Sequence, residues 1–188
     1  MTSPNFTSYP HVSEKLPDRS IYEILDTLNA LNEKLGVFSD EFVVIGGASL
    51  VLRRLRSVTP DIDILASNEA FKRMRGFAGA VVKLPPKRAL ENGATNTSVW
   101  LNTSWTRVPV SAATEMGDGY YPISYSQYDR EELDLIGGHA IMPLDDVWGS
   151  KAALQRPKDL SDLELIAKAT GRSGLLPAPI YQGPYTDS

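Results

Sequence analysis

A short apolar run that ends on two glycines constrains the fold of this chain more than any other feature. Residues 42–45 (Phe-Val-Val-Ile) have the length and composition of a buried strand, and Gly46-Gly47 follows them directly. Residues 48–55 are then expected to form a helix that starts on the glycines. A strand joined to a helix by so tight a turn is typical of proteins in which helices pack on a sheet. The turn therefore favours an α/β or α+β fold.

The rest of the chain alternates predicted strands with helices and ends in a helical pair. Apolar spacing predicts a helix from Ile21 capped by Asp18 or Ser20, and Ser67 is expected to cap another over residues 69–77. Further strands are predicted at 61–65, 80–84, 98–101 and 106–110, a hairpin around Gly137-Gly138, and helices at 144–154 and 160–170. We expect a loosely held arm at 1–20, one domain at 21–170 and an irregular tail at 171–188.

Composition excludes several classes of function. The 188 residues contain no Cys and two His, which excludes disulfide frameworks, thiolate zinc sites and cysteine nucleophiles. No apolar run approaches the ~18 residues that span a bilayer, and the start of the chain lacks the order of a secretory signal, so a cytoplasmic protein without membrane contact is expected. The net charge of the chain is −4, yet residues 51–90 contain nine Lys or Arg and only three Asp or Glu. This basic segment suggests a phosphate-bearing ligand, and a solvated helix face is the alternative interpretation.

Two aspartates lie two positions apart on the predicted strand at 61–65. Because side chains alternate along a strand, Asp61 and Asp63 point to one face while Ile62 and Ile64 point to the other. Two like charges on one face repel, and a divalent cation such as Mg²⁺, which prefers oxygen ligands, is the usual reason for the pairing. A half-exposed edge strand with its polar residues outward is the alternative.

The glycine pair predicts an anion site next to these acids. Main-chain N–H groups are free at a helix N-terminus, and glycines leave them accessible to a phosphate. Ser49 lies in the first turn of the same predicted helix. The spacing does not fit a dinucleotide-binding loop, which needs a third glycine, or a Walker A loop, which needs a following Gly-Lys-Ser/Thr.

Together these segments resemble a known enzyme superfamily. Residues 42–50 (Phe-Val-Val-Ile-Gly-Gly-Ala-Ser-Leu) and 59–65 (Thr-Pro-Asp-Ile-Asp-Ile-Leu) are similar to the core motif of the polymerase-beta-like nucleotidyltransferases. The closest likeness is to the branch of abortive-infection AbiEii-type toxins and minimal nucleotidyltransferases. Residues 142–163, with Lys151 and the segment Lys-Asp-Leu-Ser-Asp at 158–162, resemble the C-terminal helix pair of that branch. The resemblance implies a mixed sheet flanked by helices.

The resemblance also implies an activity and roles for individual residues. In that family a nucleotide passes from a nucleoside triphosphate to an acceptor hydroxyl, with release of pyrophosphate. By position, Asp61 and Asp63 would bind Mg²⁺, and Gly46, Gly47 and Ser49 would hold the nucleotide. Lys151 would neutralise triphosphate charge and assist catalysis, with Asp159 or Asp162 on the far wall of the site. The implied acceptor is RNA, tRNA or a protein, and the implied partner is a cognate antitoxin.

The sequence departs from the family pattern at several positions. Active members place a third carboxylate on a later strand, and the strand predicted at 106–110 has none, while Glu115 and Asp118 lie beyond it. Ile45 replaces a common Lys, and a common Arg is shifted by one position to Arg56. A protein that binds nucleotide without turnover is therefore the second hypothesis, and an antibiotic-type enzyme with a small-molecule acceptor is the third.

Other residues have a structural as well as a functional interpretation. Asp159 could simply cap the last helix, with Asp162 in its first turn, and Lys151 could face solvent. Two groups of basic residues, at 53–56 and 72–75, could hold the phosphates of an RNA acceptor. The tyrosines within 120–128 could stack a base but more commonly pack under a loop, and His139 is expected in a turn or the core.

Overall fold

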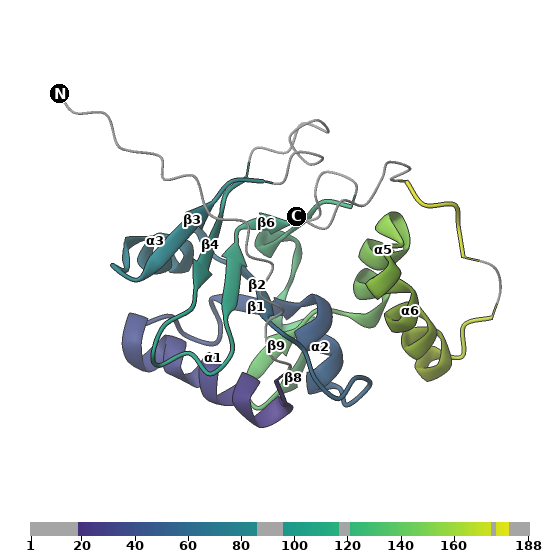
Figure 1. The fold of residues 1–188 in the computed structure, drawn as a ribbon, viewed down its shortest axis with the longest axis horizontal. Coiled ribbons are helices and arrows are strands. Elements are labelled where there is room, and N and C mark those ends of the chain that lie inside the picture. Colours follow the sequence, from purple (N-terminus) through teal and green to yellow (C-terminus); the bar gives the residue numbers. More distant parts are fainter. Residues whose placement is uncertain (1–18, 86–95, 117–120, 174–175, 181–188) are drawn as a thin grey trace.

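The computed structural model describes residues 19–85, 96–116, 121–173 and 176–180 (Figure 1). Its larger elements, in chain order, are α1 (Ile21–Leu35), β1 (Phe42–Ile45), α2 (Gly46–Leu52), β2 (Ile62–Ala66), α3 (Asn68–Gly76), β3 (Ala80–Lys83), β4 (Ser98–Leu101), β5 (Val110–Ala113), β8 (Asp134–Ile136), β9 (His139–Ile141), α5 (Leu144–Leu154) and α6 (Pro157–Thr170). Two short strands, β6 (Glu115–Met116) and β7 (Ile123–Ser124), and two 3₁₀ turns lie between β5 and β8. Most of the arm predicted at 1–20 lies outside the described residues.

A mixed seven-stranded sheet in the order β3-β4-β5-β2-β1-β9-β8 forms the centre of the fold. β2 pairs antiparallel with β1 and parallel with β5, and β1 pairs parallel with β9. Asp63 is opposite Ile45 on one side and opposite Ser111 on the other. The predicted α/β class, with a mixed sheet flanked by helices and a C-terminal helical pair, is confirmed.

The two faces of the sheet are covered differently. One face carries the main core, in which side chains of α1 and α3 pack against alternate residues of β1, β2, β4 and β5. The other face has a smaller core at its β1–β9 end, formed with α5, α6 and the segment around Ile123. Figure 1 shows α5 and α6 together at the end of the molecule opposite to β3 and β4. The acid-bearing face is therefore walled on one side by the C-terminal helices.

Local capping explains most of the element boundaries. Ser20 and Glu23 form a capping box at the start of α1, and Gly36 ends that helix in the left-handed conformation with φ 61°. The Ser67 hydroxyl accepts a hydrogen bond from the Ala70 N–H at the start of α3, as predicted. Gly137 and Gly138, both with positive φ, join β8 to β9 in the predicted hairpin. Among the described residues no helix is long and apolar enough to cross a membrane.

The strand predicted at 106–110 is wrong in position, because β5 begins only at Val110. The N–H groups of Arg107 and Val108 donate to the Thr27 hydroxyl of α1, each at 3.1 Å, and are not available to a neighbouring strand. Pro109 has no N–H to donate, although its carbonyl accepts from the Ile62 N–H at 2.9 Å. Pairing with β2 therefore starts one residue later and continues to Ala113.

Candidate functional site

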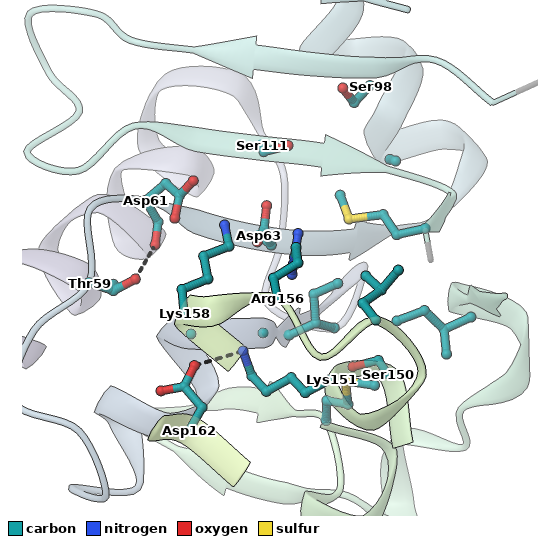
Figure 2. A pocket seen from close by; sticks show the side chains of 18 of the residues that line it. Thr59, Asp61, Asp63, Ser98, Ser111, Ser150, Lys151, Arg156, Lys158 and Asp162 are labelled. Atoms are coloured by element: carbon teal, nitrogen blue, oxygen red, sulfur yellow. Dashed lines mark hydrogen bonds and ion pairs between the residues drawn. The ribbon is translucent and has the colours of Figure 1, made fainter. Parts of the chain in front are cut away.

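A cavity of about 350 Å³ lies where the acid-bearing face of the sheet meets the N-terminal turn of α2 and the C-terminal helices. Six residues that the sequence analysis proposed for the site line this cavity: Gly46, Gly47, Asp61, Asp63, Lys151 and Asp162. Figure 2 shows Asp63 on β2 and Asp61 just before it, with Lys151 and Asp162 on one side and Ser111 and Ser98 on the other. Segments far apart in the chain thus converge on one cavity. Among the described residues, the other charged side chains of its wall are those of Arg56, Glu115, Arg156 and Lys158.

Asp63 of β2 points toward the glycine turn, and Asp61 stands directly before that strand. A Cβ placed on Gly46 would lie 3.3 Å from Oδ2 of Asp63, so this carboxylate rests directly against the turn. The main-chain carbonyl of Asp61 accepts a hydrogen bond from the Thr59 hydroxyl at 3.1 Å, which fixes the entry to β2. Neither carboxylate forms an ion pair with another residue in the described ranges. Asp63 is therefore in contact with the glycine turn, while Asp61 shares the cavity with it.

The backbone conformation favours glycine at position 46, and close side-chain neighbours favour it at position 47. Gly46 has φ +59°, a conformation that side-chain-bearing residues rarely adopt. A Cβ on Gly47 would lie 3.0 Å from the Thr59 hydroxyl oxygen and 3.2 Å from an Arg56 guanidinium nitrogen. Ser49 lies behind this turn rather than in the cavity wall, because it is fully buried and its hydroxyl donates to the Gly46 carbonyl at 2.7 Å. Its observed contact stabilises the turn.

Lys151 and the two aspartates of α6 form a buried ion-pair network. The Lys151 ammonium is 2.7 Å from Oδ2 of Asp162 and 3.3 Å from Oδ1 of Asp159. Asp159 is fully buried and also accepts from the main-chain N–H of Arg156 at 3.2 Å and from its Nε at 2.6 Å. Burial tends to raise the pKa of Asp159, yet Arg156 and Lys151 together hold that pKa below its ordinary value.

This network decides between the two interpretations of its members. Asp159 does not line the cavity, and its carboxylate caps the N-terminus of α6, the structural alternative considered for it. Lys151 does not face solvent, since its side chain is 9% exposed and its charge is paired. Asp162 lines the cavity and also meets Arg56 at 3.4 Å. The arrangement joins α5, α6 and the segment after α2 into one wall.

Three cations not assigned to the site by the sequence analysis line the cavity. Arg56 leaves the loop after α2 and lies against the glycine turn, where it lines the cavity. Arg156 and Lys158, at the start of α6, extend toward Asp61 and Asp63 in Figure 2. Lys158 forms no ion pair with the residues that the structure describes. Its sequence signal was its place as the first residue of the segment at 158–162.

Ser111 occupies the position next to Asp63 on the neighbouring parallel strand. A carboxylate there would complete a cluster of three acids on one face. The strand predicted at 106–110 contains no carboxylate, and neither does the observed strand β5 at Val110–Ala113. Glu115 lines the cavity from β6, and Asp118 lies outside the described residues.

The donor set fits a hard divalent cation. Two carboxylates without cationic partners share one face of a cavity whose other wall is basic. Within the ranges that the structure describes, no group of three or more His, Cys, Asp or Glu side chains forms a candidate metal cluster. Mg²⁺ commonly binds proteins through one or two carboxylates and keeps its other positions for water and substrate phosphates. Asp61 and Asp63 match that pattern.

Burial and repulsion make the charged form of Asp63 costly. Burial, followed by the negative charge of Asp61, raises the pKa of Asp63 from 3.8 to about 7, against the opposing effects of Lys158, Lys151 and Arg156. The folded metal-free protein therefore holds a proton that the unfolded chain releases between about pH 4 and pH 7. Its stability falls as the pH rises through this window.

We expect Asp63→Asn to stabilise the metal-free protein at about pH 8 by on the order of 2 kcal/mol, and to change stability little at about pH 4.5. The amide removes the charge that the folded state disfavours only where that charge is present. Urea unfolding at the two pH values measures the difference. Glu164→Gln, at an exposed position of α6 outside the cavity, is the control. An equal effect of Asp63→Asn at both pH values contradicts this assignment.

Comparison with known proteins adds structural likeness only. No protein-family model matches the sequence, and no curated protein matches it significantly. Among solved structures, the chain is similar to a candidate nucleotidyltransferase from Helicobacter pylori, with 15% identity, a TM-score of 0.45, and coverage of 79% of this chain and 67% of that one. It is also similar to JHP933 from Helicobacter pylori, with 16% identity, a TM-score of 0.44, and coverage of 78% and 66%. The chain thus spans about two thirds of the length of each.

Proposed function

We propose that the protein is a Mg²⁺-dependent nucleotidyltransferase that moves a nucleotide from a nucleoside triphosphate to an acceptor hydroxyl. The observation that carries the proposal is the contact of Asp63 with the glycine turn. Oδ2 of Asp63 lies 3.3 Å from the point where a Cβ would stand if residue 46 had a side chain. It joins a carboxylate pair to a turn that Arg56 also touches. A cation-bound triphosphate needs both kinds of group side by side.

In the proposed reaction each wall of the cavity has a separate task. Asp61 and Asp63 would hold Mg²⁺, which supplies neutralisation of phosphate charge when bound. Arg56 and Lys158, with the N–H groups of the glycine turn, would bind the β- and γ-phosphates. Lys151, already paired with Asp162, would position that wall rather than contact phosphate as a free cation.

The bonds made and broken are those of an in-line displacement. The acceptor oxygen forms a bond to the α-phosphorus, and the bond from this phosphorus to the bridging oxygen breaks, which releases pyrophosphate. The acceptor loses its hydroxyl proton in the same step. Ser111, beside Asp63, is too weak a base to take it, so the proton goes to a carboxylate of the cavity or to solvent. Catalysis then rests mainly on positioning and charge neutralisation.

Label transfer tests this proposal. We expect that incubation with Mg²⁺ and each α-³²P-labelled nucleoside triphosphate, with total RNA, tRNA or protein as acceptor, attaches label to one acceptor class. Attachment that persists without divalent cation contradicts the proposal. The presence of Ser111 where a third acid would stand favours a second candidate, a protein that binds nucleotide without turnover. Mg²⁺-dependent nucleotide binding with no transfer to any acceptor would establish that candidate.

The resemblance to the AbiEii-type branch extends the proposal to a toxin with a cognate antitoxin. In that case, expression of the chain arrests growth through its transferase activity, and Asp63→Asn relieves the arrest at equal protein levels. Growth arrest that survives this substitution would argue against a toxic transferase.

A further inference from the structure

The two acids of the cavity are held in place by different parts of the structure. Asp63 lies within β2 and is opposite Ile45 on one side and Ser111 on the other, so the sheet fixes its main chain. Asp61 stands before the strand, and neither ladder includes it among the paired residues that the structure describes. A pair of metal ligands is precise only when both side chains are held. Asp61 therefore needs a support outside the sheet.

Thr59 supplies that support. Its hydroxyl donates a hydrogen bond to the main-chain carbonyl of Asp61 at 3.1 Å, which Figure 2 shows beside the cavity. Pro60 lies between the two residues, and its ring restricts the backbone because it fixes φ. The hydrogen bond and the proline together limit the directions in which the chain can carry Asp61 into the cavity wall.

Thr59 is itself held firmly. Its main-chain N–H donates to the Arg19 carbonyl at 2.9 Å, and its carbonyl accepts from the Arg19 N–H at 2.8 Å. The residue is 1% exposed. Its hydroxyl oxygen also lies 3.0 Å from the point where a Cβ on Gly47 would stand, so it rests against the glycine turn. One buried hydroxyl thus meets both the glycine turn and the main chain of Asp61.

We propose that Thr59 is a positioning residue for metal binding, whose buried hydroxyl sets where the Asp61 carboxylate stands relative to Asp63 and the glycine turn. The inference rests on the proposed function, because it takes Asp61 and Asp63 as the ligands of Mg²⁺. Residues that orient metal ligands without touching the metal typically change its affinity by about 10- to 100-fold when they are replaced. A hydroxyl needed only for the fold would lower stability and leave the affinity for metal unchanged.

Titration with Mn²⁺, followed by electron paramagnetic resonance of the free ion, tests this role without nucleotide or turnover. Mn²⁺ prefers the same kind of oxygen ligands as Mg²⁺. We expect Thr59→Val to bind Mn²⁺ about tenfold more weakly than wild type, because valine nearly keeps the shape of threonine but has no hydroxyl. Thr59→Ala should show the same loss, and Thr59→Ser, which keeps the hydroxyl, should bind Mn²⁺ as wild type does.

Thr27→Val is the matched control for a loss of stability alone. Thr27 is a second fully buried threonine, and it lies on α1 outside the cavity wall. Its hydroxyl accepts from the N–H groups of Arg107 and Val108, so valine there leaves two donors without their partner. We expect Thr27→Val to lower the urea midpoint at least as much as Thr59→Val does, and to leave Mn²⁺ binding unchanged.

The outcome in wild type separates this inference from the function on which it rests. If wild type binds Mn²⁺ and Thr59→Val binds it equally well, Thr59 has no positioning role, and the transferase proposal stands. An equal loss of Mn²⁺ affinity in Thr27→Val, or no recovery in Thr59→Ser, also overturns the inference, since the loss would not depend on this hydroxyl. Wild-type protein that binds no Mn²⁺, alone or with a nucleoside triphosphate, contradicts the metal site of the proposed function, and with it any role for Thr59 there.

Discussion

Asp63→Asn reduces nucleotide transfer by at least about a thousandfold, and Asp61→Asn has an effect of similar size. Both carboxylates line the cavity without an ion-pair partner in the described chain, and each would supply a ligand to the same cation. Removing a group that neutralises charge in the transition state costs ~10²–10³ in rate even for a neutral donor, and a cation ligand is expected to cost more. Initial rates of label transfer at saturating nucleotide measure the loss.

Stability separates loss of chemistry from loss of fold in these variants. The Asp63→Asn variant should lack transferase activity and yet be at least as stable as wild type above neutral pH. The reason is that the folded state disfavours the negative charge that the substitution removes. Glu164→Gln should keep full activity. Asp63→Asn protein that transfers nucleotide at a rate within tenfold of wild type would remove the acid pair from the mechanism.

Lys151→Met lowers the free energy of unfolding by about 3 kcal/mol, the largest loss of stability that we expect from a single substitution in the site. Methionine has nearly the volume of the lysine stem but leaves the carboxylates of Asp159 and Asp162 buried with less compensation. Urea unfolding at neutral pH measures the loss. Lys168→Met, at an exposed position near the end of α6, should change stability by less than about 0.5 kcal/mol.

A double-mutant cycle shows whether the loss comes from the ion pair. Adding Asp162→Asn to Lys151→Met should recover about 1 to 2 kcal/mol, because the amide removes the uncompensated charge. In the Lys151→Met single variant Arg56, at 3.4 Å from Asp162, still compensates part of that charge. Losses that simply add in the double variant would show that Lys151 and Asp162 are not energetically coupled.

Periodicity was sufficient to predict the half of the site that lies on one strand. Side chains alternate along a strand, so a strand predicted at 61–65 places Asp61 and Asp63 on one face. The observed strand β2 begins at Ile62, and both acids still line one cavity. The helix starting on the glycines followed from the same local reasoning. The strand predicted at 106–110 failed because its N–H groups bind Thr27, a partner some 80 residues away that no local pattern indicates.

The basic wall could not be predicted in the same way. Whether Lys158 faces a cavity depends on how α5 and α6 pack on the sheet, and its spacing along the chain does not contain that information. Arg56 reaches the glycine turn from a loop, where side-chain direction follows no period. These groups are all positioned by tertiary packing rather than by local sequence.

Binding of a nucleoside triphosphate in the presence and absence of Mg²⁺ tests the central claim most directly, because it needs no knowledge of the acceptor. Calorimetric titration with each non-hydrolysable triphosphate should give one site that depends on Mg²⁺, is lost in Asp63→Asn and is weakened at least about tenfold in Arg56→Gln. Equal affinity without Mg²⁺, or in Asp63→Asn, would show that the cavity beside the glycine turn is not a site for a metal-bound triphosphate.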